Sequence, residues 1–213
     1  GYEEAGAQGL LAGANAALAA RGNEPLVLRR NDAYMGVLID DLVTKGVDEP
    51  YRMFTSRAEF RTLLRQDNAD VRLTPIGHAI GLASEVRMKA VNEKLKGSEA
   101  VIKVLRDMSF APEDANTWLT EIGTEPVRQK MRYISLLTRP QIDLQGMIQA
   151  FPSLKEKLSE LGTTEEQIEH AEITVKYEGY IQKEQELAEK MSRLEYISIP
   201  ETLDFSSIQS LSS

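Results

Sequence analysis

The sequence predicts an all-α protein, a mainly helical multi-helix bundle with little or no sheet. The first observation behind this fold class is that apolar residues recur every three or four positions through most of the chain, as on one face of a helix. The second is that caps and glycine or proline stops divide this pattern into segments of helical length. With 213 residues, 42% of them hydrophobic, the chain can bury one sizeable core. No internal repeat or linker divides it into two domains.

Two helices are predicted in the first quarter of the chain. One covers about residues 1–20, is rich in glycine and alanine, and ends at Gly22, which can take the left-handed conformation that often follows a helix. The other covers about residues 33–45, follows Asp32, which can cap it, and stops at Gly46. A short extended piece is expected at residues 52–54.

The later segments are also predicted to be helical. After Pro75 we expect a short helix and turn at 77–82, then a helix capped by Ser84 that breaks at 97–98. The remaining helices are predicted at 101–105, from Pro112 to a stop at Gly123, at 127–137, at 144–151, and from a Thr163 or Thr164 cap to about Arg193. The last of these is the longest.

The stretch of residues 49–73 holds five arginines in a chain whose formal net charge is −8. Ser56 followed by Glu59 matches a capping box, which predicts that a helix begins at Arg57. Arginines spaced four apart along that helix would form a stripe beside its apolar face. Such a stripe suits a phosphate backbone. The candidate nucleic-acid-binding residues are Arg29, Arg52, Arg57, Arg61 and Arg65.

Another interpretation of these arginines stays open. They can instead form internal salt bridges with acidic residues of the same chain, because rows of charge are more often solvated or internally paired faces than binding sites. The candidate partners in that case are Asp40, Asp41, Asp67 and Asp70. For the adjacent pair at 40 and 41, salt bridging or capping is favoured over acid–base catalysis, because neighbours on a helix point in different directions.

Acidic residues crowd the last third of the chain, which leaves the arginine-rich first third locally basic. Without cysteine, and with His78 and His170 far apart, the sequence offers no short metal-binding motif, and we identify no catalytic residues. Trp118 is expected in the core, Lys94 and the lysines around it in solvent. Tyrosines 177 and 180 are expected to serve as core or interface residues rather than to stack on bases.

The chain carries no targeting or membrane signal. No stretch approaches the roughly 18 uninterrupted apolar residues of a spanning helix. The start also lacks the basic region and cleavage site of a signal peptide. These features predict a cytoplasmic protein that does not contact membranes.

Three segments of the sequence carry a family resemblance. EPYRMFTSRAEFRTLLRQDNADVRLT (49–74), GVLIDDLV (36–43) and GYEEA (1–5) resemble the GidA/MnmG family, the flavoprotein subunit of a tRNA-modifying enzyme. The resemblance implies that residues 1–22 are the closing helix of an FAD-binding domain lying outside this chain. Residues 23–213 would then be the C-terminal helical domain, ending before the last small helical module of the family.

The resemblance also implies cofactors and partners. The full-length enzyme would use FAD, with NAD as a further nucleotide, to form the 5-carboxymethylaminomethyl group on the wobble uridine, U34, of certain tRNAs. Its partners would be tRNA, an MnmE-type GTPase subunit and a second copy in a homodimer. Gly1, Tyr2 and Glu3 would lie beside the flavin. We expect this chain by itself to bind no FAD and to be inactive, because the glycine-rich dinucleotide turn is not within it.

Two other function classes are considered. The chain can be a helical protein–protein interaction or dimerisation module in which the arginines are structural. Phosphate contacts would make the affinity for RNA fall steeply with salt, whereas structural arginines would lower the stability of the protein when they are removed. An independent hydrolase or metalloenzyme is disfavoured because no nucleophile–base set or ligand cluster is found in the sequence.

Overall fold

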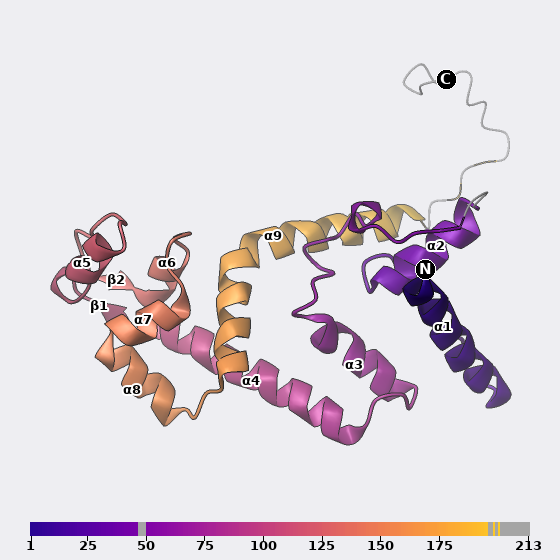
Figure 1. The fold of residues 1–213 in the computed structure, drawn as a ribbon, viewed down its shortest axis with the longest axis horizontal. Helices are drawn as coiled ribbons and strands as arrows, with labels where there is room; N and C mark the ends of the chain where they lie inside the picture. The colour runs from indigo at the N-terminus through magenta and orange to yellow at the C-terminus, as the bar shows by residue number, and fades with distance from the viewer. Residues whose placement is uncertain (47–49, 196–197, 199, 201–213) are drawn as a thin grey trace, which may run out of the picture.

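A computed structural model describes residues 1–46, 50–195, 198 and 200. Within these residues the prediction of an all-α protein is confirmed, and helices α1 to α9 account for most of the chain (Figure 1). They are α1 (Tyr2–Ala20), α2 (Tyr34–Thr44), α3 (Ala69–Ala79), α4 (Glu85–Asp107), α5 (Pro112–Glu121), α6 (Tyr133–Leu137), α7 (Leu144–Ala150), α8 (Pro152–Glu160) and α9 (Glu165–Glu195). A 3-10 turn, η1 (Thr55–Arg57), and a two-residue pairing of antiparallel strands β1 (Ser109–Phe110) and β2 (Met131–Arg132) complete them.

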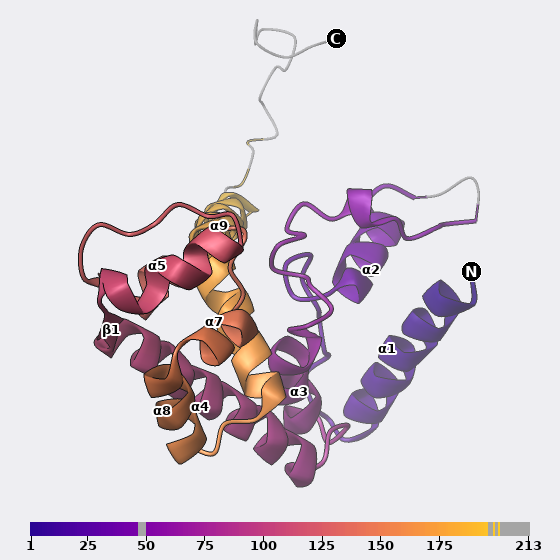
Figure 2. The same ribbon diagram turned by 60° about the vertical axis from the view of Figure 1, so that its left-hand side comes forward.

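The helices form an elongated molecule. α1 and α2 lie at one end and α5 to α8 at the other, with α4 running between them (Figures 1 and 2). α9 first packs along α4 and then bends toward α2 (Figure 1). The arginine-rich segment, which we define as residues 50–68, packs on α2 and contacts the distal half of α9, where the Leu63 N–H donates to the Glu184 carboxylate at 3.2 Å.

The main core lies where α4 and α9 meet α5 to α8. Leu105, Leu137, Leu154 and Ala171, from four different helices, are fully buried there. Four aromatic rings fill its centre, with neighbouring ring centroids 5.0 to 5.7 Å apart: Phe110, Trp118, Tyr133 and Phe151. Trp118 is partly buried against this core, as expected.

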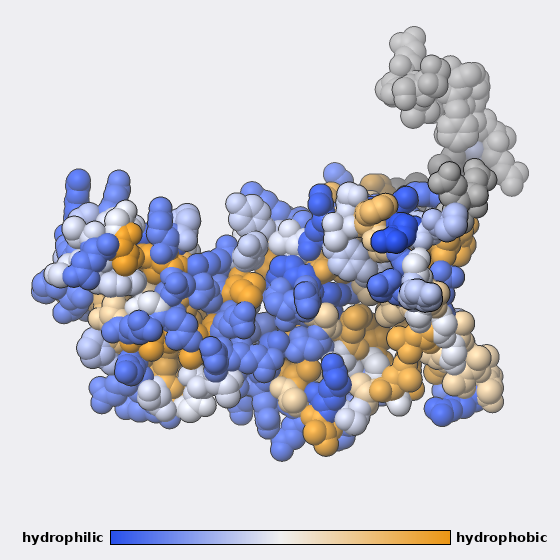
Figure 3. All heavy atoms as spheres, in the orientation of Figure 1, coloured by the Kyte–Doolittle hydropathy of each residue, from blue (hydrophilic) through white to orange (hydrophobic). Residues whose placement is uncertain are grey.

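A second, smaller core holds the arginine-rich segment against α2. Val37 of α2 is fully buried beside Ala58 and Leu64, and Tyr34 and Met53 pack against them. On the face shown in Figure 3, hydrophobic residues also gather over α1 and α3. An apolar cavity of about 220 Å³, lined mostly by residues of these two helices, lies there.

Several predicted boundaries are confirmed. Gly22 follows α1 with a φ of 71°, and the predicted helix at 33–45 is α2. The Ser84 hydroxyl accepts a hydrogen bond from the Arg87 N–H at 3.3 Å, so Ser84 caps α4. Thr164 caps α9 in the same way, by accepting from the Gln167 N–H. Asp32 is not the cap of α2, because its carboxylate accepts from the Arg29 N–H instead.

The predicted helix beginning at Arg57 is wrong. η1 ends at Arg57, and the next helix begins only at Ala69. The capping box fails because the Glu59 carboxylate pairs with Arg30, 29 residues away, instead of returning to the Ser56 N–H. Arginines 57, 61 and 65 therefore do not form a stripe along one helix.

Other differences have equally local causes. Pro75 lies inside α3, where the packing of α3 on α4 offsets the loss of the hydrogen bond that proline cannot make. Residues 77–79 are therefore the end of this longer helix and not the start of a separate one at 77–82. α4 continues through Gly97, against which the amide end of the Gln167 side chain of α9 packs. The segment at 127–137 is shortened by β2 to α6. The extended backbone of Phe54 agrees with the extended piece expected at residues 52–54, and no strand is assigned to these three residues.

Gly36 offers a direct test of how closely α2 packs on the preceding segment. A Cβ at this position would collide with the Arg29 carbonyl, and backbone cannot swing aside as a side chain does. We expect Gly36→Ala to lower the free energy of unfolding by about 2 kcal/mol. Gly13→Ala in α1, where no atom lies within 4 Å of a built Cβ, is the matched control and should be neutral or stabilising. Urea unfolding of both variants checks this expectation. Equal free energies of unfolding for Gly36→Ala and Gly13→Ala would contradict it.

None of the helices within the described residues combines the length and the apolar character needed to cross a bilayer.

Candidate nucleic-acid interface

Asp41 is the centre of a charged network beneath the arginine-rich segment. Its side chain is 1% exposed. Oδ1 accepts from Arg30 Nη1 at 2.7 Å and from Lys45 Nζ at 2.8 Å, and Oδ2 accepts from the Tyr51 hydroxyl at 2.7 Å. Burial by itself would raise the pKa of Asp41, but these hydrogen bonds hold that pKa well below its usual value. The network therefore contains a permanent, compensated buried charge.

Arg30 is the main cation of this network, because its guanidinium pairs with three carboxylates. Its guanidinium also pairs with Asp40 at 2.8 Å and with Glu59 at 2.7 Å, and its Nη2 donates to the Arg57 carbonyl at 3.1 Å. The hydrogen bond with Glu59 raises the pKa of Arg30 above its ordinary value. Arg30 thus ties α2 to η1. No local sequence signal indicates this role, since the adjacent arginines at 29 and 30 have similar surroundings in the sequence.

Arg57 lies on top of this network. Its guanidinium carbon is 4.6 Å from the centroid of the Tyr51 ring, and its Nη1 is 3.8 Å from Asp41 Oδ2. Its side chain is 42% exposed. Arg57 therefore has a defined position and an open outer side.

Three more of the candidate arginines face solvent. The Arg52 side chain is 69% exposed, and the nearest carboxylate oxygen, on Glu4, is 3.9 Å from its Nε. Arg29 and Arg61 are exposed, and neither forms an ion pair within 4.0 Å among the residues that the structure describes. These guanidinium groups can accept an anionic ligand without first breaking a close internal salt bridge.

Arg65 differs from the other candidates because it is turned inward. Its side chain is 18% exposed and reaches Asp67 through Nε at 3.0 Å and Nη2 at 3.1 Å. Its Nη1 donates to the Thr62 carbonyl at 2.5 Å. Close internal pairing, the alternative interpretation, thus describes Arg30 and Arg65. Arg52 and Arg57 have only long ion pairs, at 3.9 and 3.8 Å.

The predicted cofactor-side residues lie at the start of α1. Tyr2 is 95% exposed and Glu3 is also exposed, while Glu4 is turned inward. The Glu4 carboxylate accepts from the Met53 N–H at 2.9 Å and lies 2.8 Å from the chain's amino group. A cavity of about 350 Å³, which Glu3 also lines, separates this end of α1 from α2.

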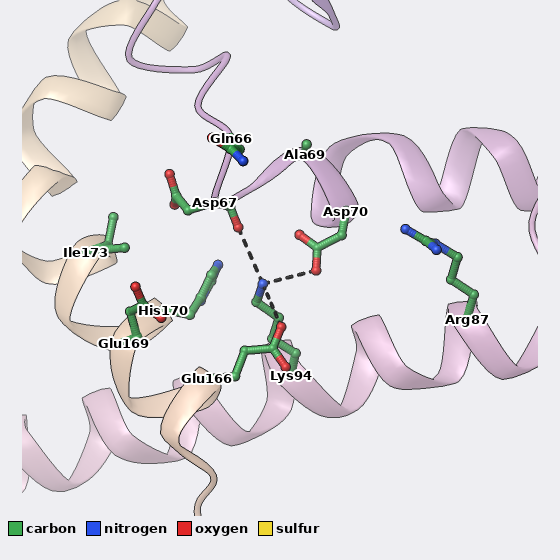
Figure 4. Close-up of a pocket in the computed structure, with 10 residues that line it drawn as sticks. All are labelled: Gln66, Asp67, Ala69, Asp70, Arg87, Lys94, Glu166, Glu169, His170 and Ile173. Atoms are coloured by element: carbon green, nitrogen blue, oxygen red, sulfur yellow. Dashed lines mark hydrogen bonds and ion pairs between the residues drawn. The ribbon is translucent and has the colours of Figure 1, made fainter. Parts of the chain in front are cut away.

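A second polar cluster joins α3, α4 and α9 (Figure 4). Lys94 is 10% exposed and pairs with Asp70 at 3.0 Å and with Glu166 at 3.1 Å, beside a cavity of about 680 Å³. His170 lines the same cavity, and its Nδ1 is 3.0 Å from the Ser98 hydroxyl. Burial, and after it the charge of Lys94, lowers the pKa of His170. The prediction that Lys94 is solvated is wrong, because its ammonium anchors three helices together.

The two tyrosines of α9 are not core residues. Tyr177 is 44% exposed and Tyr180 is 66% exposed, with ring centroids 6.3 Å apart. The Arg65 guanidinium lies 5.8 Å from the Tyr177 ring. The core part of the expectation is wrong, and the interface part stays a prediction.

Comparison with known proteins identifies relatives along the whole chain. Residues 85–185 match the family model for the tRNA modifying enzyme MnmG/GidA C-terminal helical domain. The tRNA uridine 5-carboxymethylaminomethyl modification enzyme MnmG of Flavobacterium psychrophilum is 51% identical over 212 residues, and that of Christiangramia forsetii is 50% identical. Each comparison covers 100% of this chain and 34% of the relative. The chain thus spans about a third of the length of these curated relatives.

Solved structures agree with these comparisons. GidA of Aquifex aeolicus in its form II crystal is 38% identical, with a TM-score of 0.73 over 100% of this chain and 32% of that chain. The form I crystal gives 39% identity and a TM-score of 0.63. The chain belongs to the MnmG/GidA family, and it includes the C-terminal helical domain of that family.

Proposed function

We propose that this chain is the helical C-terminal region of a tRNA wobble-uridine modification enzyme and that it contributes a tRNA-binding surface. The observation that carries the proposal is the division among the arginines. Arg30 and Arg65 are committed to internal carboxylates, whereas Arg52, Arg57 and Arg61 face solvent from the same short segment. Guanidinium groups left open on a chain with a net charge of −8 suit an RNA backbone, because phosphate binding depends on local positive potential.

The salt dependence of tRNA binding tests this proposal. We expect the variant with Arg52→Ser, Arg57→Ser and Arg61→Ser to bind a labelled tRNA more weakly than the unmodified chain. Its plot of log affinity against log salt should be shallower by about one unit for each lost phosphate contact. Fluorescence anisotropy across a salt series measures both quantities.

A charge-matched control separates contact from net charge. Arg128, Lys130 and Arg132 are exposed and lie near β2, at the far end of the molecule from α1 and α2 (Figure 1). Replacing these three residues by serine removes the same charge, and we expect the salt slope to stay near that of the unmodified chain. An equal loss in both triple variants would contradict a localised surface, and a well-folded chain that binds no tRNA would contradict the proposal altogether.

The proposal extends to the cofactors of the complete enzyme, FAD and NAD, and to its cytoplasmic location. The first-turn N–H groups of α1 have no partner inside the helix and favour an anion. The start of α1 can therefore lie beside the ring of a negatively charged, reduced flavin, but it cannot hold the whole cofactor. Nothing in the sequence offers the glycine-rich turn that would hold a pyrophosphate. Bound FAD would supply redox chemistry, and Gly1, Tyr2 and Glu3 would contribute only to its surroundings.

We also propose protein contacts, with an MnmE-type GTPase subunit and with a second copy of the enzyme. Support comes from the distal half of α9, where Tyr180, Leu187 and Leu194 are 49 to 66% exposed at intervals of seven residues. Apolar side chains at this spacing lie on one side of a helix, as in helix–helix interfaces. An exposed apolar row of this kind favours a protein neighbour over solvent.

A further inference from the structure

The position of Arg57 is determined by residues that do not face solvent. Its guanidinium lies over the Tyr51 ring, and its main-chain carbonyl accepts a hydrogen bond from Arg30 at 3.1 Å. The Tyr51 ring is in turn fixed through its hydroxyl, which donates to Asp41 Oδ2 at 2.7 Å. An arginine held over an aromatic face in this way loses fewer rotamers when it binds a ligand than one extending freely into solvent.

The two carboxylate oxygens of Asp41 have different hydrogen-bond partners. Oδ1 is occupied by the cations of Arg30 and Lys45, at 2.7 and 2.8 Å. Oδ2 is left for the Tyr51 hydroxyl, and it lies 3.8 Å from Arg57 Nη1. Because Arg30 and Lys45 already balance the charge of the carboxylate, it can orient Tyr51 and Arg57 without forming a close ion pair with Arg57. The outer edge of that guanidinium stays available.

We propose that Asp41 and Tyr51 are positioning residues for Arg57 in tRNA binding. Asp41 holds the Tyr51 hydroxyl, the Tyr51 ring supports the guanidinium, and Arg57 contacts an RNA phosphate. This inference rests on the proposed function and adds to it a buried residue that touches no RNA. Arg61 is exposed and has no aromatic ring recorded beneath it among the described residues, so it provides an internal comparison.

A double-mutant cycle on tRNA affinity tests the proposal. Tyr51→Phe keeps the ring and removes only the hydroxyl that Asp41 holds. In the unmodified chain we expect this variant to weaken tRNA binding about threefold, and in an Arg57→Ser background to have no further effect. In an Arg61→Ser background, the same change should again weaken binding about threefold, because the two positions act independently. Thermal unfolding of each variant verifies that it is folded.

A second variant removes the support itself. Tyr51→Leu takes away the aromatic face, and we expect a loss of affinity close to that of Arg57→Ser, about tenfold. A structural role alone would lower the melting temperature without making the loss depend on whether Arg57 is present. The cycle therefore distinguishes positioning from general stability.

The possible failures have different meanings. If Tyr51→Phe has no effect, or weakens binding equally with and without Arg57, the positioning role is overturned while the proposed function stands. If Arg57→Ser itself leaves affinity and salt slope unchanged, the positioning role falls along with the Arg57 contact in the proposed function. If the triple variant nevertheless binds tRNA more weakly than the unmodified chain, the RNA surface is assigned to Arg52 and Arg61.

Discussion

Phe151→Ala is expected to lower the free energy of unfolding by about 4 kcal/mol. Phe151 is 2% exposed, and its ring contacts three other aromatic rings: those of Phe110 at 5.0 Å, Tyr133 at 5.1 Å and Trp118 at 5.7 Å between centroids. Its removal would lose the transfer free energy of a buried ring and leave a cavity at the centre of the main core. Urea unfolding followed by the fluorescence of Trp118, the single tryptophan, measures this change.

Phe54→Ala is the matched control for this variant. Phe54 is 55% exposed in the arginine-rich segment, so its truncation should change stability by less than about 0.5 kcal/mol. Similar losses for the two phenylalanines would contradict the placement of the main core around Phe151.

Arg30→Ala is expected to cost about 3 kcal/mol of folding free energy, because it removes one of the two cations bonded to the buried Asp41 and also leaves Asp40 and Glu59 without their partner. The neighbouring Arg29→Ala removes the same charge from an exposed side chain and should change stability by less than about 0.5 kcal/mol. Arg30→Lys should restore only part of the loss, since an ammonium cannot reach Asp40, Asp41 and Glu59 with the geometry of a guanidinium. Chemical unfolding at pH 7 of the three variants compares them.

The pH dependence of the Arg30→Ala variant follows from Asp41. The folded protein holds the pKa of Asp41 below its unfolded value, so the stability from this carboxylate is present above an unfolded pKa of about 3.9. It is lost as the pH falls further toward the folded pKa. The gap between Arg30→Ala and the unmodified chain should therefore narrow as the pH falls below about 4. A constant gap, or equal stabilities of Arg29→Ala and Arg30→Ala at pH 7, would contradict the role of Arg30.

The regular parts of the fold could be predicted because local signals agreed with packing. α2 and α9 have apolar faces, and α9 also has a threonine cap, so neighbouring residues determine much of each helix. The same is true of the end of α1 at Gly22. Family membership was equally accessible, since it depends on the identity of the residues and not on their conformation.

The charged network could not be predicted because its partners are far apart in the sequence. Glu59 has the right spacing for a capping box, but the guanidinium of Arg30 competes for its carboxylate and prevails. Nothing local distinguishes Arg30 from Arg29, or Lys94 from the solvated lysines around it. Burial decides each case, and burial arises only when α2, η1, α3 and α9 come together.

The central claim, that the arginine-rich segment faces tRNA, is tested most directly by site-specific photocrosslinking. A photoreactive phenylalanine analogue would be placed at position 61 and, as a control, at position 132 near β2, both exposed positions. We predict that irradiation with tRNA yields a crosslink from position 61 that disappears at high salt, and none from position 132. A crosslink from position 132 alone would contradict the claim and place the RNA at the opposite end of the molecule.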